Sequence, residues 1–303
     1  MIVVVEDLSY SYDSRIAIQD LSFAVPKGQI FGILGPNGGG KSTLFRILST
    51  MMHPSSGRAS IAGFDVRTHP AEVRRRIGVV FQSQSLDKKL TVAENLHSQG
   101  HLFGLHGRAL QFRVEDLVQR LGLYGRTSDL VGTLSGGLRR RVEIAKALLH
   151  EPSVLLMDEP STGLDPGARR DLWNYIERLR REQDVTVLLT THILEEADRC
   201  DRLLLLHQGR KVIEGPPAEL KSRVGGDVVV LETAAENGFE ESLAARFGVQ
   251  PHRVDGRLRV EIANGHRFIA EVVEAFPGAI ESIALHRPTL EDVFLSETGA
   301  LIE

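Results

Sequence analysis

Apolar residues along this chain are gathered in short continuous runs, with polar, turn-rich stretches between them. Runs as continuous as these are typical of a sheet that is covered on both faces, as in α/β folds. The runs expected to be strands in the first two thirds of the chain are Ile2–Val5, Leu21–Val25, Gln29–Leu34, Ile77–Phe81, Val154–Met157, Val185–Thr190 and Leu203–Leu206. The pattern therefore predicts an α/β class.

Between Gln84 and His150 the strand pattern stops and helical spacing dominates. We interpret residues 84–150 as a helical insertion, with helices over Thr91–Leu105, Arg113–Leu121 and Leu138–His150. From about Lys221 the order becomes βαββαβ, with elements over Asp227–Leu231, Glu236–Phe247, His252–Val254, Leu258–Ile262, Arg267–Phe276 and Ile280–His286. This order predicts a small ferredoxin-like domain, residues 221–303, after a first domain of residues 1–220.

The composition narrows the class of protein. With 42% hydrophobic and 25% charged residues, the chain is ordinary for a globular protein, and its net charge of -4 lacks the basic surface of a general nucleic-acid binder. The single cysteine, Cys200, favours a reducing compartment. No export signal is seen, and no apolar run approaches the roughly 18 to 20 residues needed to cross a bilayer. We therefore expect a cytoplasmic protein whose membrane role, if it has one, comes from a partner.

A glycine-rich segment follows the run Gln29–Leu34 and matches the pattern G-x-x-x-x-G-K-[ST] between a strand and a helix. Its glycines let the backbone N–H groups point at phosphate oxygens, and the start of the helix adds positive potential. We expect Lys41 to hold the β and γ phosphates and Ser42 to bind magnesium. The residues expected to bind the phosphates of a nucleotide here are Gly35, Pro36, Asn37, Gly38, Gly39, Gly40, Lys41, Ser42 and Thr43.

Two adjacent carboxylates end the apolar run Val154–Met157. Asp158 is expected to be an outer-shell ligand of a bound magnesium ion. Glu159 is expected to orient the attacking water or accept its proton. Such a strand end is ordinarily a solvated feature. Together with the glycine-rich loop, however, it predicts a phosphate-loop NTPase.

The segment Leu134-Ser135-Gly136-Gly137-Leu138 opens a predicted helix and resembles the signature motif of ABC ATPases. Two glycines at a helix start expose backbone N–H groups to an anion, and Ser135 can cap the helix or donate to a phosphate. The resemblance implies a core with an antiparallel β-subdomain and a helical insertion. It also implies ATP and Mg²⁺ as cofactors, and a head-to-tail dimer in which Ser135, Gly136 and Gly137 contact the ATP held by the other copy.

Other elements of that family follow in chain order. Gln82 resembles the glutamine that contacts magnesium, with Gln84 as the alternative, and Asp165 ends a segment resembling the D-loop, which also contacts ATP across the dimer. His192 resembles the histidine that contacts the γ-phosphate. Tyr12 resembles the aromatic residue on which adenine stacks, and Tyr10 is the alternative. The resemblance thus implies these catalytic residues: Lys41, Gln82, Glu159 and His192.

The implied function is ATP hydrolysis that powers a separate integral membrane permease at the cytoplasmic face of the membrane. The segment Arg287–Phe294 resembles the tail of ABC ATPases of the drug, polysaccharide and lipid exporter branch, such as the daunorubicin-resistance type. Two alternatives remain open at this point. One is an ABC ATPase that acts on the ribosome or DNA without a membrane, and the other is a regulatory nucleotide-binding module.

Leu138 stands where many members of the family carry glutamine, so no nucleotide role is assigned to it. The arginine runs Arg74–Arg76 and Arg139–Arg141 are expected to form a solvated or interface face, since successive residues on a helix point in different directions. We expect no specific nucleic-acid partner.

Overall fold

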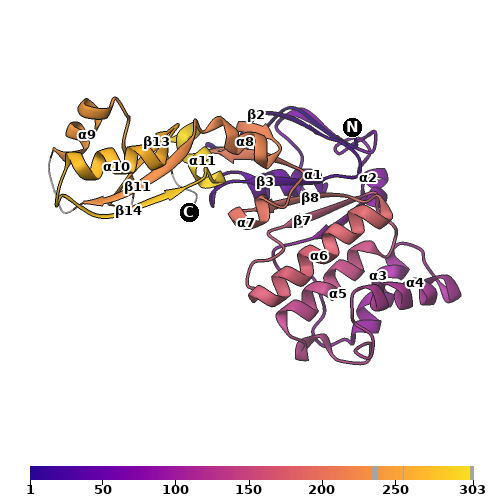
Figure 1. The fold of residues 1–303 in the computed structure, drawn as a ribbon. Helices are drawn as coiled ribbons and strands as arrows, with labels where there is room; N and C mark the ends of the chain where they lie inside the picture. The colour runs from indigo at the N-terminus through magenta and orange to yellow at the C-terminus, as the bar shows by residue number, and fades with distance from the viewer. Residues whose placement is uncertain (234–237, 255, 301–303) are drawn as a thin grey trace. The chain divides into compact units, whose positions relative to one another are not determined.

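The computed structural model describes residues 1–233, 238–254 and 256–300. The chain divides into two compact units, residues 1–214 and residues 215 onward (Figure 1). The boundary expected after residue 220 falls inside helix α8, Pro217–Arg223. Helix α8 packs against helix α11, Leu290–Thr298, so it belongs to the second unit.

A six-stranded sheet forms the centre of the first unit, in the order β10-β9-β3-β8-β7-β6. Its strands are β3 (Ile30–Leu34), β6 (Ile77–Val80), β7 (Val154–Asp158), β8 (Thr186–Thr191), β9 (Arg202–His207) and β10 (Arg210–Gly215). The pairs β6–β7, β7–β8, β8–β3 and β3–β9 are parallel. Every residue of β3, β7 and β8 is buried, which explains why these strands are recognisable as continuous apolar runs.

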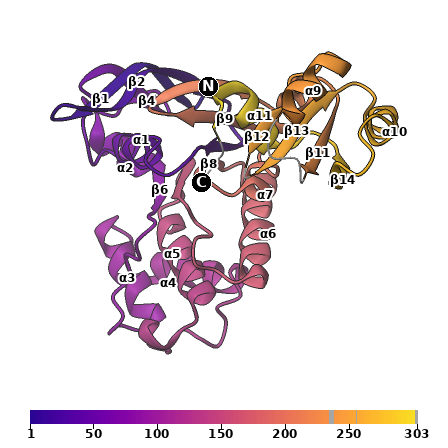
Figure 2. The same ribbon diagram turned by 90° about the vertical axis from the view of Figure 1, so that its left-hand side faces the viewer.

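A four-stranded antiparallel sheet, in the order β2-β1-β4-β5, makes the second layer of this unit (Figure 2). Its strands are β1 (Val3–Tyr12), β2 (Arg15–Val25), β4 (Ser56–Ile61) and β5 (Phe64–Asp65). Strands β1 and β2 are longer than expected, because their outer halves carry polar residues and irregular register. Their inward side chains, among them Leu8 of β1, share one core with the central sheet. Phe31 of β3 and Phe45 belong to the same core.

The helices of the first unit are α1 (Lys41–Leu48), α2 (Pro70–Arg76), α3 (Val92–Leu102), α4 (Gly107–Arg120), α5 (Gly136–Leu148), α6 (Pro166–Gln183) and α7 (Leu194–Ala197). Helices α3, α4 and α5 lie within the expected insertion and form a group beside the sheets (Figures 1 and 2). Helix α4 begins well before the expected Arg113. No helix in the described ranges is long and apolar enough to cross a membrane.

The second unit contains a four-stranded sheet in the order β12-β13-β11-β14, with every neighbouring pair antiparallel. Its strands are β11 (Asp227–Thr233), β12 (His252–Val254), β13 (Arg257–Ile262) and β14 (Ile280–His286). Helices α9 (Phe239–Phe247) and α10 (Gly265–Ala275) contribute Leu243 and Phe268 to the core of this unit. The elements follow the predicted βαββαβ order, although the first residues expected in α9 lie outside the described ones. Helix α11 begins with a capping box formed by Thr289 and Asp292.

Candidate active site

The glycine-rich loop joins β3 to α1, and two of its glycines lie too close to other backbone atoms to carry a side chain. A Cβ atom at Gly35 would lie 2.2 Å from the Leu206 carbonyl oxygen, and one at Gly40 would lie 2.5 Å from that of Ala17. Gly40 also has φ of 102°, a left-handed conformation that favours glycine. These positions bring the loop against β9 and β2, so the neighbouring strands fix its shape.

Lys41 is the first residue of α1, and its ammonium group is held by the loop itself. Its Nζ atom donates to the carbonyl oxygens of Gly35, at 2.7 Å, and Pro36, at 3.0 Å. The side chain is 4% exposed, and this burial lowers the pKa of Lys41, opposed by the nearby Glu159. The loop thus surrounds one buried cationic group, as binding of a phosphate requires.

Asp158 ends β7 and lies beside the start of α1. Its Oδ1 atom accepts a hydrogen bond of 2.6 Å from Thr190 Oγ1, on the neighbouring strand β8. Burial raises the pKa of Asp158, while the hydrogen bonds from Thr190 and Ser42 lower it. A buried carboxylate with a serine hydroxyl beside it offers oxygen ligands of the type that Mg²⁺ prefers.

Glu159 follows Asp158 and has φ of 45°, a left-handed conformation that is unusual for a residue other than glycine. Its N–H bonds to Thr190, at 3.2 Å to the carbonyl oxygen and 3.0 Å to Oγ1. This backbone turn directs the carboxylate away from that of Asp158 and toward three other predicted residues. The conformation is therefore part of how the site is assembled.

The Glu159 carboxylate is the centre of this group. Gln82 Nε2 donates to Glu159 Oε2 at 3.2 Å, and Lys41 Nζ lies 3.6 Å from Oε1. His192 Nδ1 lies 3.3 Å from Oε1, without the geometry of a hydrogen bond. Thr162 Oγ1 also donates to Oε2, at 3.3 Å. The structure thus brings together the four residues expected to be catalytic, which come from α1 and from the ends of β6, β7 and β8.

A cavity of about 350 Å³ opens between the glycine-rich loop and this group. Its size lies within the range of small-molecule sites. Its lining residues are Tyr12, Arg15, Ala17, Asn37, Gly38, Gly39, Gly40, Lys41, Ser42, Thr43, Gln82 and Glu159. Gln82 lines the cavity, whereas Gln84 is not among these residues.

Tyr12 lines the cavity and is 40% exposed, and its hydroxyl lies 3.4 Å from Thr43 Oγ1. Tyr10 packs against the core of the unit, with its ring 4.9 Å from that of Tyr12. The geometry therefore favours Tyr12 over Tyr10 as the aromatic residue available to a ligand.

Arg15 is a lining residue that the sequence analysis did not select. It begins β2, and its guanidinium lies beside Gly38, where an added Cβ would be 3.7 Å from Nη2. The signal in the sequence was weak, since an arginine shortly after Tyr12 is an ordinary residue for a turn between strands. Only the pairing of β1 with β2 brings this cation to the loop.

The signature segment does not line this cavity in the described part of the chain. Ser135 caps α5, with its Oγ atom accepting from the Leu138 N–H at 3.3 Å. Asp165 caps α6 in the same way, with Oδ1 accepting from the Ala168 N–H at 2.9 Å. A Cβ atom at Gly137 would lie 2.8 Å from that of Ala168, so this glycine allows α5 and α6 to approach closely. One copy of the chain therefore presents these residues separately from its own cavity.

One expectation about the arginine runs is wrong. Arg74, Arg75 and Arg76 are exposed, as expected, but Arg140 is buried and forms an ion pair with Glu143. The helix turns Arg140 inward because it lies one turn from the buried position Ile144 and two turns from the buried position Ala147. The second run is thus not a uniformly solvated face.

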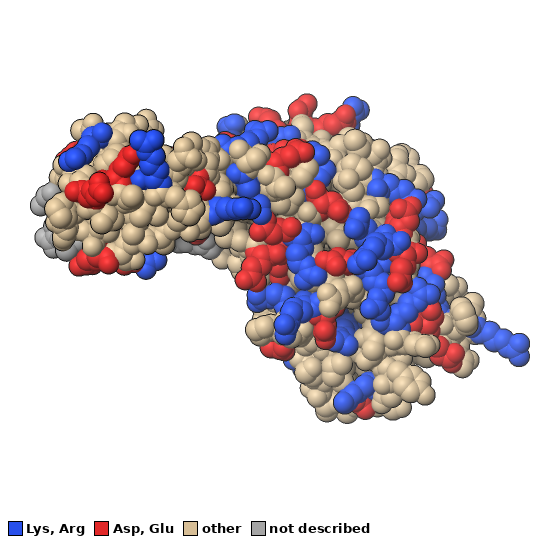
Figure 3. Space-filling view, viewed as in Figure 1, with Lys and Arg blue, Asp and Glu red and all other residues tan. Residues whose placement is uncertain are grey.

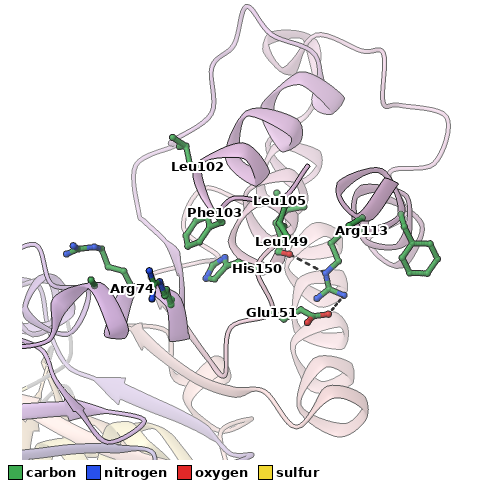
Figure 4. A pocket seen from close by; sticks show the side chains of 12 residues that line it. Arg74, Leu102, Phe103, Leu105, Arg113, Leu149, His150 and Glu151 are labelled. Atoms are coloured by element: carbon green, nitrogen blue, oxygen red, sulfur yellow. Dashed lines mark hydrogen bonds and ion pairs between the residues drawn. The ribbon is translucent and has the colours of Figure 1, made fainter. Parts of the chain in front are cut away.

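A larger cavity, of about 850 Å³, lies between α2, α3, α4 and the end of α5 (Figure 4). The Phe103 ring stacks on His150 with centroids 3.8 Å apart, and Arg113 bonds to the Leu149 carbonyl oxygen and to Glu151. Two apolar side chains of this groove are unusually exposed: Leu102 at 81% and Phe112 at 72%. Exposed apolar side chains at a hollow are typical of protein contact sites.

Comparisons with known proteins place these observations in a family. The model of the ABC transporter family matches residues 18–162. The chain is 39% identical to the daunorubicin resistance ATP-binding protein DrrA3 of Streptomyces coeruleorubidus, over 98% of this chain and 96% of that protein. It is 38% identical to the Nod factor export ATP-binding protein I of Burkholderia lata, over 95% of this chain and 94% of that protein.

Solved structures give the same result. The cbiO1 protein of Clostridium perfringens, part of an ABC transporter complex, matches with a TM-score of 0.68 and 28% identity, over 82% of this chain and 96% of that one. A dimeric ATP-binding cassette bound to ADP and phosphate matches with a TM-score of 0.64 and 26% identity, over 71% of this chain and 98% of that one.

Proposed function

This chain belongs to the ABC transporter family, as an ATP-binding subunit of the exporter type, and from this we propose that it hydrolyses ATP to drive a separate membrane permease. The observation that carries the proposal is the meeting of Lys41, Gln82 and His192 around the Glu159 carboxylate, beside the cavity of the glycine-rich loop. Catalysis of phosphoryl transfer is mostly positioning and electrostatic stabilisation, which such a group can provide.

Each residue has a distinct part in this proposal. The loop N–H groups and Lys41 bind the phosphates, and the Lys41 ammonium leaves its carbonyl partners for the more negative ligand. Glu159 orients the attacking water and accepts its proton, and His192 contacts the γ-phosphate. Tyr12 stacks on the adenine. The buried position of Glu159 keeps bulk water from competing at the reacting centre.

Magnesium fits the oxygen-bearing side chains at this site. Among the described residues, no three His, Cys, Asp or Glu side chains are grouped as a metal site. A Mg²⁺ ion commonly has one or two protein ligands and completes its shell with substrate phosphates and water. Ser42, Gln82 and Asp158 would hold it here. When bound, the ion would neutralise charge on the transferring phosphoryl group.

We further infer that the working form is a head-to-tail dimer of this chain. Ser135, Gly136, Gly137 and Asp165 lie outside the lining of the cavity of their own copy. The N-terminus of α5 attracts an anion, so a second copy can bring it to the γ-phosphate. A related cassette is a dimer in its solved structure, which supports this arrangement.

Replacing Glu159 by glutamine tests the function. Glu159→Gln keeps the shape of the side chain and one of its two acceptor oxygens but cannot accept a proton. We expect ATP binding to persist although one acceptor oxygen becomes an amide donor, phosphate release to fall by about 100-fold or more, and dimers to accumulate with ATP. The control is Glu182→Gln, at an exposed position on α6. Turnover by Glu159→Gln at the rate of this control would exclude Glu159 as the base.

The exposed apolar groove is the surface that we assign to the permease. Leu102 and Phe112 project from it, and Arg74, Arg75 and Arg113 line it, so it fits a segment with an apolar face and acidic ends. The relatives are named for drug resistance and Nod factor export, which supports an exporter located at the membrane through that partner.

The double variant Leu102→Asp with Phe112→Asp tests this surface. We expect it to hydrolyse ATP as a free subunit but to sediment less with membranes, because charges replace the apolar contact. The control is Tyr124→Asp, since Tyr124 is 85% exposed and lies outside the groove. Equal loss of membrane association in both proteins would argue against a specific groove.

The alternatives fit less well. A subunit that acts on the ribosome or DNA is not favoured, because the relatives are exporters and the face shown in Figure 3 interleaves Lys and Arg with Asp and Glu. A regulatory module is disfavoured by the presence of both Glu159 and His192 in one group. We assign the second unit to the ferredoxin-like class from its strand order, as an accessory domain.

A further inference from the structure

The segment that carries Gln82, residues 81–90, connects β6 to α3 without forming a helix or strand. Peptide groups in such a segment lack the regular partners of secondary structure, and they must find others. Several of these partners are side chains of a single helix, α5, which begins at the signature motif.

Arg140 and Glu143 hold the two ends of the part of this segment that contains Gln82. Arg140 Nη1 donates to the Phe81 carbonyl oxygen at 2.8 Å, and the Ser85 N–H donates to Glu143 Oε1 at 2.8 Å. Arg140 Nη1 also donates to Glu143 Oε2 at 2.9 Å. Lys146 Nζ adds a bond of 2.8 Å to the Ser85 carbonyl oxygen. We refer to Arg140, Glu143 and Lys146 as the α5 clamp.

Burial distinguishes this clamp from an ordinary surface ion pair. The Arg140 and Glu143 side chains are 7% and 2% exposed. A buried ion pair contributes little net stability, because the loss of hydration offsets the attraction of the charges. Apolar side chains could fill the same space, so stability alone does not explain the pair. The specific effect of these charges is to fix peptide groups on either side of Gln82.

We infer that Arg140 and Glu143 are positioning residues that keep Gln82 in register with the signature motif. Ser135 and the clamp belong to one short helix, so a movement of α5 moves both the signature motif and the Gln82 segment. Gln82 in turn bonds to Glu159. Helix α5 ends at Leu148, and the next two residues, Leu149 and His150, line the apolar groove.

This arrangement makes α5 a rigid link between three places. The groove lies at its C-terminal end, the Gln82 segment along its side, and the signature motif at its N-terminus. The inference rests on the proposed function, because it concerns residues that act on ATP.

The principal test is the double variant Arg140→Met with Glu143→Gln in the full chain. Removing both charges leaves no unpaired buried ion, so the protein is expected to fold with a Tm close to that of wild type. We expect kcat for ATP hydrolysis to fall about tenfold and KM for ATP to change by less than about threefold, because the clamp acts on Gln82 and not on the phosphate loop. The matched control, Arg120→Met with Asp116→Asn, removes an exposed pair on α4 and should leave both constants unchanged.

A milder variant covers the case in which the double variant does not fold. Lys146→Met removes the bond to the Ser85 carbonyl oxygen and the attraction of the ammonium group to Glu143, from a helix face that is partly exposed. We expect a fall in kcat of about twofold to threefold with an unchanged Tm. The inference would be overturned if the double variant folds and both it and Lys146→Met have the kcat of the wild-type protein.

A cycle with Gln82→Ala separates positioning from general damage. If the clamp acts through Gln82, adding the double variant to Gln82→Ala should lower kcat little further, because the same contribution is already lost. If the fold-decreases in kcat caused by the double variant and by Gln82→Ala multiply in the combined protein, the clamp does not act through Gln82. Absence of ATP hydrolysis by the wild-type chain and by its complex with the permease would instead contradict the proposed function.

Discussion

The two parts of the candidate ATP site differ in how completely one chain builds them. Around the glycine-rich loop, Lys41 and Glu159 are buried and bonded to other members of the site. Ser135 and Asp165 are exposed, and their observed bonds only cap the helices that they begin. The first part is preorganised within one copy, whereas the second consists of exposed helix ends.

This difference predicts different effects for substitutions around the glycine-rich loop and for substitutions in the signature segment. A change in the preorganised part alters both folding and chemistry, because the same contacts serve both. A change in the signature part can leave folding intact and disturb only the joining of two copies.

Mixing two inactive variants should give the largest effect. Lys41→Ala removes the phosphate contact of its own copy, and Gly136→Asp places a negative charge where the partner's γ-phosphate would lie. Each alone should lose about 100-fold in hydrolysis. An equal mixture should regain about a quarter of wild-type activity, since half of the dimers then contain one intact site out of two. The measurement is phosphate release after co-refolding or coexpression.

The same mixture provides its own control. Asp at a helix N-terminus favours folding, so Gly136→Asp should have a Tm at or above that of wild type. Mixing two preparations of Lys41→Ala should regain nothing. If the mixture of Lys41→Ala with Gly136→Asp also regains no activity while both variants are folded and dimeric, the two copies do not share ATP sites. The proposed division of the site between two copies would then be wrong.

Glycine-to-alanine substitutions should separate the two parts by stability. Gly35→Ala places a Cβ against the Leu206 carbonyl oxygen and should lower the free energy of unfolding by about 1 to 3 kcal/mol. At Gly136 the nearest atom to an added Cβ is 3.9 Å away, so Gly136→Ala should change stability by less than about 0.5 kcal/mol. Denaturant unfolding measures both values, and equal destabilisation would contradict the assignment of Gly35 as a packing-constrained position.

The smallest effect is expected at Asp165. Asp165→Ala should destabilise the first unit by about 1 kcal/mol through loss of the α6 cap, whereas Asp165→Asn should retain that cap. Thermal unfolding distinguishes the two variants. If Asp165→Asn is as stable as wild type but hydrolyses ATP more slowly, the carboxylate has a role in the dimer beyond capping. Wild-type rates would limit Asp165 to its role in α6.

The central sheet was predictable because its strands are buried on both faces. The runs around β3, β7 and β8 need no knowledge of neighbours to be recognised. The outer halves of β1 and β2 were missed, since their residues alternate irregularly and pair through register shifts. Local spacing also placed the start of α4 too late, because its first turn has no side-chain cap.

The candidate site was predictable where a local pattern determines the chemistry. The glycine-rich loop and the carboxylates that end β7 each follow from a few adjacent residues. Arg15 and Arg140 were not identified, because their positions depend on contacts between distant segments. Arg15 reaches the cavity through strand pairing, and Arg140 is turned inward by the packing of α5 against β6.

The left-handed backbone of Glu159 has a consequence for engineering this protein. Such a conformation in a residue with a side chain is typically destabilising by about 1 kcal/mol or more, and glycine would relieve it. Selection for thermal stability alone would therefore favour replacing the residue to which we assign proton transfer. Stability and turnover are in conflict at this position, and variants enriched for heat resistance should be screened for phosphate release before they are used.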